Sequence, residues 1–182
     1  MPDAPASPPA PPFRVGLGYD LHRLEPLTPT GKGRPLILGG VRFESPAVDG
    51  VAVGPVGHSD ADALLHAITD ALLGAIGAPD IGQLFPDDDP RHESGDSRVF
   101  LEEAARCVRA AGYEIGNIDA TVVLERPKLG PRKGEVRASI AAMLGLDASR
   151  VNVKGKTHER VDAVGEGRAV EAHAVALLLL RA

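Results

Sequence analysis

The chain has 182 residues, 43% of them hydrophobic and 25% charged, which suits one globular domain with a substantial core. Its 20 Lys and Arg residues against 25 Asp and Glu residues give a formal net charge of −5. This charge argues against a broad nucleic-acid-binding surface but leaves room for local pockets that hold phosphates. The single cysteine excludes an intrachain disulfide, and the longest apolar stretch, residues 174–180, is too short to cross a bilayer. We therefore expect a cytoplasmic protein that binds neither nucleic acid nor membrane.

The N-terminal residues 1–12 contain six prolines and predict a disordered extension before a single domain over residues 13–182. The domain is expected to begin with a strand over residues 13–18. A hairpin is predicted around Gly39-Gly40, between residues 36–38 and 41–43, and an edge segment over residues 51–56.

Helices and strands are expected to alternate in the rest of the chain. Helices are predicted over residues 60–76, 97–111 and 134–144, the second capped by Asp96 and ended by Gly112. Strands are predicted over residues 119–124 and 151–154, while residues 172–180 fit a strand or a helix. This order indicates an α+β sandwich of ferredoxin-like topology, with a mixed sheet of four to five strands, helices on one face, and a βαβ crossover through the third helix.

Asp20 and His22 form the first part of a predicted metal site. Residues i and i+2 of a strand face the same side, so both side chains can turn away from Leu21 toward one ion. His66, within the first predicted helix, would add a third ligand and leave an open coordination position, as catalytic zinc sites do. Each piece also has a plain structural explanation, because Asp-x-His is common by chance and a helical His is more often a hydrogen-bonded core residue.

Ser59 and Asp62 resemble a capping box at the start of the first helix, with Asp62 in the place of the usual Glu. Such a cap needs no function of its own. It would place His58 directly before the helix, where exposed amides and the helix dipole favour an anion such as a phosphate.

Three loops could contact a ligand, and for each of them a solvated surface turn is the alternative. Residues 80–90 are rich in acid and proline, so their carboxylates could bind substrate hydroxyls while Ile81 and Phe85 line an apolar recess. Residues 126–131 contain two prolines, and their free amides could read the edge of a base. Residues 154–160 combine a glycine with Lys, Thr, His and Arg side chains that could bind a phosphate.

In this order the motifs resemble those of the 2-C-methyl-D-erythritol 2,4-cyclodiphosphate synthases of the non-mevalonate isoprenoid pathway, from about residue 13 to the C-terminus. The motifs that carry the resemblance are Gly18-Tyr19-Asp20-Leu21-His22, His58-Ser59-Asp60-x-Asp62-x-x-x-His66, Asp80-Ile81-Gly82, Phe85-Pro86-Asp87-x-Asp89-Pro90, Asp96-Ser97, Arg126-Pro127-Lys128 and Val151-Asn152-Val153-Lys154. The resemblance implies a homotrimer of small α+β catalytic domains with active sites between neighbouring subunits.

The reaction that this resemblance implies is that of a phosphorus–oxygen lyase. It would convert 4-diphosphocytidyl-2-C-methyl-D-erythritol 2-phosphate to 2-C-methyl-D-erythritol 2,4-cyclodiphosphate and CMP. The 2-phosphate would attack the β-phosphorus of its own diphosphate bridge, so holding the two phosphates in line would supply much of the acceleration. A general base is not required, because the attacking phosphate is already ionised at neutral pH.

The resemblance also implies roles for individual residues. Asp20, His22 and His66 would hold Zn²⁺, and Glu159 would hold Mg²⁺ or Mn²⁺ between the substrate phosphates. His58 and Thr157 would stabilise the transition state. The implied substrate contacts are Ser59, Asp80, Ile81, Gly82, Phe85, Asp87, Asp89, Leu124, Arg126, Pro127, Lys128, Lys156 and His158.

The chain departs from the family pattern near its end. Many members carry three threonines, a Phe and a Gly-Arg-Gly-Glu-Gly run, whereas this chain has Lys156-Thr157-His158, Ala163 and Gly165-Glu166-Gly167-Arg168. Thr157 and Glu159 keep their positions. The contact of the missing Phe, and any ligand held in the central cavity of a trimer, therefore stay open.

Three other classes of protein would use the same metal ligands. A metal-dependent phosphodiesterase or phosphatase would activate water there, and product analysis would separate it. A non-haem iron oxygenase also uses two His and one carboxylate, and metal analysis would identify it. A metal that only braces a binding module predicts that loss of His22 unfolds the protein.

Overall fold

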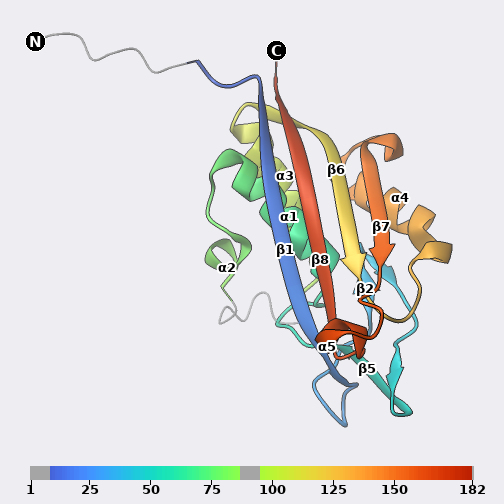
Figure 1. Cartoon of the computed structure of the whole chain (residues 1–182). Coiled ribbons are helices and arrows are strands. Elements are labelled where there is room, and N and C mark those ends of the chain that lie inside the picture. Colours follow the sequence, from blue (N-terminus) through green and yellow to red (C-terminus); the bar gives the residue numbers. More distant parts are fainter. Residues whose placement is uncertain (1–8, 87–94, 182) are drawn as a thin grey trace, which may run out of the picture.

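A mixed β-sheet with helices on one face forms the body of the molecule in a computed structural model, which describes residues 9–86 and 95–181 (Figure 1). The strands are β1 (Phe13–Pro26), β2 (Ile37–Leu38), β3 (Val41–Arg42), β4 (Ala47–Val48), β5 (Val51–Pro55), β6 (Tyr113–Val123), β7 (Val151–Lys156) and β8 (Ala169–Leu180). The helices are α1 (Ala63–Ile76), α2 (Ile81–Leu84), α3 (Arg98–Ala110), α4 (Lys133–Leu144) and α5 (Asp162–Gly165), with 3₁₀ turns η2 (Gly130–Arg132) and η3 (Ala148–Arg150).

The main sheet has the strand order β4-β5-β1-β8-β6-β7, and β2 and β3 form a separate hairpin. Strand β8 pairs antiparallel with β1 on one side and β6 on the other, whereas β6 and β7 are parallel neighbours joined through α4. The α+β class, the hairpin and the βαβ crossover are thus confirmed, and residues 172–180 belong to a strand. Six strands replace the expected four to five. The ferredoxin-like topology is not confirmed, because β6 and β7 lie side by side with no strand between them.

Strand β1 continues well past its predicted end at residue 18. Its even-numbered residues face the helices, and along this face glycines give way to Asp20 and His22. Polar residues therefore occupy inward positions while Leu21 faces outward. This reverses the usual apolar-in, polar-out alternation of a half-buried strand, which explains why the sequence pattern ended the strand too early.

Helix α1 lies unusually close to β1. A Cβ atom at Gly16 would be 1.9 Å from the carbonyl oxygen of Ala71, and one at Gly18 would be 1.9 Å from that of Ala67. Glycine in the strand and alanine in the helix let the two backbones touch. This packing fixes the position of His66, which neighbours Ala67 on the helix, relative to Asp20 and His22 on the strand.

The predicted capping box at Ser59 is wrong, because α1 begins at Ala63 with Asp62 as its N-cap. One Asp62 carboxylate oxygen accepts the N–H groups of Leu64 and Leu65 at 3.1 Å each. The same buried carboxylate accepts N–H groups from Gly39 and Gly40 at 2.9 and 2.7 Å. Asp62 therefore joins the β2-β3 hairpin to the helix that carries His66.

The start of α3 agrees with the sequence more closely, since Asp96 accepts the N–H of Arg98 at 2.8 Å. Within residues 9–86 and 95–181, no helix has the length and apolar character needed to cross a membrane. The predicted disordered extension falls mostly on residues 1–8, outside the described part of the chain, and stays a prediction.

Candidate active site

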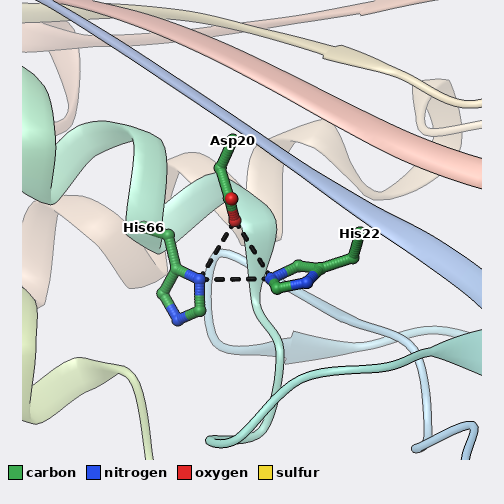
Figure 2. A group of neighbouring side chains, drawn as sticks. All are labelled: Asp20, His22 and His66. Atoms are coloured by element: carbon green, nitrogen blue, oxygen red, sulfur yellow. Dashed lines mark hydrogen bonds and ion pairs between the residues drawn. The ribbon is translucent and has the colours of Figure 1, made fainter. Parts of the chain in front are cut away.

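Three side chains of the predicted metal site converge between β1 and α1 (Figure 2). Asp20 Oδ2 lies 3.0 Å from His22 Nε2 and 3.0 Å from His66 Nδ1. The two ring nitrogens are 3.2 Å apart. Two ligands thus come from one strand at i and i+2, and the third comes from the helix that packs on it, as the sequence predicted.

The donor set and its spacing suit a tetrahedral metal site. With metal–ligand bonds of about 2.0–2.1 Å, neighbouring ligand atoms of a tetrahedral zinc ion are about 3.3 Å apart. The three distances between Asp20, His22 and His66 atoms are 3.0 to 3.2 Å, so a small outward movement would admit the ion. Two imidazoles and one carboxylate also leave the fourth corner for a substrate oxygen.

Asp20 and His66 stabilise each other's charged forms. Burial opposes ionisation of Asp20, yet hydrogen bonds from His22 and His66 hold the pKa of this carboxyl well below its usual range. Burial lowers the pKa of His66, but the hydrogen bond and charge of Asp20 outweigh it and raise that pKa above its usual value. A proton on His66 must leave before the ring can bind a metal, so metals and protons compete here.

The second ring nitrogen of His66 faces away from Asp20 toward a buried polar cluster. His66 Nε2 lies 2.8 Å from Ser97 Oγ and 3.1 Å from Ser59 Oγ. Both serines are buried, and the Ser97 hydroxyl donates a short hydrogen bond to Asp60. Ser97 and Asp60 stand in the sequence motifs, but the motifs predict no role for either side chain. Their spacing carries no signal, because the contact joins residues 37 positions apart.

A cleft of about 340 Å³ opens in front of the three ligands. Its further lining residues are Val56, Gly57, His58, Ser59, Ile81, Gly82, Phe85 and Phe100. The sequence did not single out Phe100, whose ring centroid is 4.5 Å from that of Phe85 and 6.1 Å from that of His66. The metal ligands, His58 and four predicted substrate contacts therefore share one cavity with an apolar aromatic wall.

The expected location of His58 at a helix start needs correction. With Asp62 as the N-cap, His58 lies four residues before it, in a turn whose carbonyl oxygen at His58 accepts a hydrogen bond from Arg34 at 3.4 Å. His58 nevertheless lines the cleft beside the metal ligands. The helix-dipole argument for a phosphate at this residue is lost, whereas its place in the cavity supports a contact with substrate.

Helix α2 brings the second predicted loop segment to the cleft. Asp70 of α1 accepts the N–H of Ile81 at 2.8 Å, which ties the start of α2 to α1. Asp80 caps the helix by accepting the N–H of Gln83 at 2.9 Å and is not among the lining residues. The predicted contacts Asp87 and Asp89 lie outside the described residues.

Most of the remaining predicted contacts lie near the ends of β6 and β7, two and three strands away from β1 in the sheet. A cavity of about 380 Å³ is lined by Val122, Leu124, Lys128, Leu129, Gly130, Gly155, Lys156 and Thr157. Lys128 also lines a neighbouring cavity together with Arg126, Pro127 and Arg160. None of these residues lines the cleft of the metal ligands, so one copy of the chain keeps the two groups apart.

Glu159 and His158 lie on the loop after β7. His158 Nδ1 lies within hydrogen-bond distance of an Asp162 carboxylate oxygen, at 2.8 Å, and Glu159 has a left-handed backbone with φ of 52°. Neither belongs to the metal-ligand group of Asp20, His22 and His66. The role of Glu159 as a ligand of a second ion therefore stays a prediction.

Residues 13–179 match the model of the YgbB family. The chain belongs to this family. It is 52% identical over 172 residues to the chloroplastic 2-C-methyl-D-erythritol 2,4-cyclodiphosphate synthase of Oryza sativa subsp. japonica, covering 94% of this chain and 72% of that one. It is 54% identical over 166 residues to the synthase of Chromobacterium violaceum, covering 91% and 98%.

Solved structures of such synthases share the fold. One of them, named as the CDP-bound form, is 44% identical with a TM-score of 0.77, and the match covers 91% of this chain and 99% of that chain. The family expected from the motifs is thus confirmed, and with it the cyclodiphosphate synthase step of the non-mevalonate isoprenoid pathway.

Proposed function

We propose that this chain makes 2-C-methyl-D-erythritol 2,4-cyclodiphosphate and CMP from 4-diphosphocytidyl-2-C-methyl-D-erythritol 2-phosphate, at sites shared between neighbouring copies of a homotrimer. The observation that carries the proposal is the Asp20, His22 and His66 group in the cleft that also holds His58. An oxygen of the 2-phosphate bonds to the β-phosphorus, and the bond from that phosphorus to the bridging oxygen breaks. CMP leaves with the bridging oxygen, so the reaction consumes no water.

Zn²⁺ is the ion that this donor set favours, and when bound it supplies a Lewis acid for a phosphate oxygen. The chain's own residues then fold the substrate back on itself. His58 and Ser59 contact the phosphates beside the metal ligands, while Ile81, Gly82 and Phe85 enclose the methylerythritol. This arrangement favours in-line attack, since positioning and charge neutralisation are the main demands of phosphoryl transfer.

The nucleotide-binding residues come from a neighbouring copy in this proposal. Asp20, Ala172, Val122 and Gly155 are consecutive partners across β1, β8, β6 and β7. Three strand spacings separate Asp20 from Gly155, roughly 14 Å along the sheet. Lys128, Lys156 and Thr157 would therefore meet the metal cleft of another copy more readily than their own. Glu159 would hold Mg²⁺ or Mn²⁺ between the phosphates at that junction.

The outer face of β1 provides a surface for such a contact. Its outward residues Phe13, Val15, Leu17, Tyr19 and Leu21 form a row of exposed hydrophobic side chains, from 44% exposure at Leu21 to 70% at Leu17. A contiguous apolar strip on a sheet face is typical of a protein–protein interface. A second and third copy would bury it in a closed ring.

The test is incubation of the full chain with substrate, Zn²⁺ and Mg²⁺, with products followed by ³¹P NMR and the assembly state followed by sedimentation. A cyclic diphosphate with CMP, made by a trimer, supports the proposal. A linear bisphosphate with CMP would mean hydrolysis and a monomer would remove the shared site, so either result contradicts it. The cytoplasmic location and the absence of nucleic-acid and membrane partners stay predictions.

A further inference from the structure

His66 is held by hydrogen bonds at both of its ring nitrogens. Nδ1 faces Asp20 and His22, whereas Nε2 lies 2.8 Å from the hydroxyl of Ser97, a fully buried side chain. The Ser97 hydroxyl in turn donates to Asp60. The three residues come from α1, from the start of α3 and from the turn before α1, so the contact is a tertiary one.

The direction of these hydrogen bonds follows from the surroundings of Asp60. Its carboxylate accepts the Ser97 hydroxyl proton, the Ser97 N–H at 3.3 Å and the Asp62 N–H at 3.2 Å. A carboxylate can only accept, and Ser97 has a single hydroxyl proton. A lone pair of Ser97 Oγ therefore faces His66, and a neutral ring with its proton on Nε2 can donate to it. The Ser59 hydroxyl lies 3.2 Å from Ser97 Oγ and can donate to its other lone pair.

We propose that Ser97 and Asp60 are positioning residues for metal binding: they fix His66 as the tautomer with Nε2 protonated and direct the Nδ1 lone pair toward Asp20 and His22. The inference deepens the metal site of the proposed function. Metal-bound histidines commonly donate their second N–H to such a partner, which sets ring orientation and increases ligand basicity. Here a serine stands between the ring and the carboxylate.

The Ser97 hydroxyl has no competing task in the helix. Ser97 is the N-cap residue of α3, but its side chain makes no capping hydrogen bond, and Asp96 accepts the N–H of Arg98 instead. Removal of this hydroxyl therefore leaves the helix start intact. Ser97→Ala removes the contacts of this hydroxyl with His66, Asp60 and Ser59 without removing a helix cap.

Zinc affinity of the full chain, measured by competition with a chromophoric chelator and without substrate, tests the inference. Ser97→Ala is expected to weaken zinc binding about 10- to 100-fold, as loss of such partners does at other sites. Asp60→Asn is expected to act in the same direction. Both Asp60 oxygens accept N–H groups, so an amide nitrogen at either position would face a donor.

The matched control is Ser59→Ala, which removes the contacts of the Ser59 hydroxyl with His66 Nε2 at 3.1 Å and with Ser97 Oγ at 3.2 Å. It keeps the hydrogen bonds of Ser97 to His66 and Asp60. It is expected to change zinc affinity less than Ser97→Ala does. ¹⁵N NMR of the zinc-loaded protein gives a second readout. In the unaltered chain Nε2 of His66 should carry a proton protected from exchange, and Ser97→Ala should shift that signal or remove its protection.

Equal zinc affinities of Ser97→Ala and the unaltered chain, or a zinc-loaded His66 with its proton elsewhere than Nε2, would overturn the inference. Thermal unfolding of the metal-free variants controls for the fold, because a general loss of structure would lower the melting temperature of Ser97→Ala well below that of Ser59→Ala. Neither readout uses substrate. A different reaction product would contradict the proposed function but not this inference. An unchanged zinc affinity of Ser97→Ala would contradict this inference but not the proposed function.

Discussion

The proposed site has two halves that are built in different ways: a metal-binding half with Asp20, His22 and His66, and a nucleotide-binding half with Lys128, Lys156 and Thr157. Asp20, His22 and His66 belong to a strand and a helix whose backbones touch through glycine, and their ligand atoms already lie 3.0 to 3.2 Å apart. Lys128 and Thr157 belong to loops that follow β6 and β7. The three proposed metal ligands thus come together within one chain. Lys128 and Thr157 line a cavity separate from the cleft of these ligands, so the proposed shared site would need a neighbouring copy to bring the two together.

His22→Ala should have the largest effect, because it removes one of two imidazoles from the metal-binding half. A metal Lewis acid supplies several kcal/mol of transition-state stabilisation, so we expect kcat/KM to fall on the order of 10³-fold. Turnover is measured by CMP release, and folding by circular dichroism. A variant that is unfolded rather than inactive would instead support a bracing metal.

Gly18→Ala tests whether backbone contact between β1 and α1 sets the spacing of the ligands. The new methyl group would lie 1.9 Å from the Ala67 carbonyl oxygen, so helix and strand must separate. We expect a loss of about 1–3 kcal/mol in the free energy of unfolding, as overpacking typically causes, together with weaker zinc binding. Gly134→Ala is the matched control, since an added Cβ there meets no atom within 4 Å. Unchanged zinc affinity in Gly18→Ala would contradict the argument.

The three metal ligands could be predicted from the sequence, but the contacts that hold them in place could not. The i, i+2 spacing placed Asp20 and His22 together because strand geometry is local. The sequence pattern predicts a capping box at Ser59, whereas Asp62 is the N-cap. Asp62 also binds the hairpin amides of residues 39 and 40, and this long-range contact leaves no signal in the local sequence. Ser97 reaches His66 only through the packing of α3, which no local pattern encodes.

The nucleotide-binding half was predicted as segments, by family resemblance, without a location relative to the metal ligands. The structure brings Leu124, Lys128, Lys156 and Thr157 to one cavity, and the register across the sheet separates that cavity from Asp20. The order of strands in a sheet depends on long-range pairing. The sequence pattern of each strand carries no record of it, so the distance between the two halves had to come from the structure.

A mixture of two variants tests whether the two halves of a site come from different copies, because each variant keeps one half intact. Lys128→Ala should lower kcat/KM about 10- to 100-fold through loss of a charged hydrogen bond, and His22→Ala should be nearly inactive. If sites form between copies, subunit exchange in an equal mixture rebuilds intact sites in about a quarter of positions. CMP release should then rise toward about a quarter of the unaltered rate. A mixture no more active than the average of its two components would show that each copy forms its own site.

The smallest effect expected is a change of zinc affinity with pH. Asp20 raises the pKa of His66, and below that pKa a proton occupies the ring that the metal needs. Zinc binding should therefore strengthen as the pH rises through this pKa, by up to about tenfold per pH unit for each proton displaced, and then level off.

The stability of the metal-free chain should change in the opposite direction with pH. A raised folded-state pKa stabilises the fold below the unfolded value of about 6.5, and that contribution is lost as the pH rises through the folded pKa. Chelator competition and thermal unfolding between about pH 6 and about pH 8 measure both trends. A zinc affinity that stays constant over this range would mean that no proton leaves His66 when the metal binds. It would contradict the competition between proton and metal at this ring.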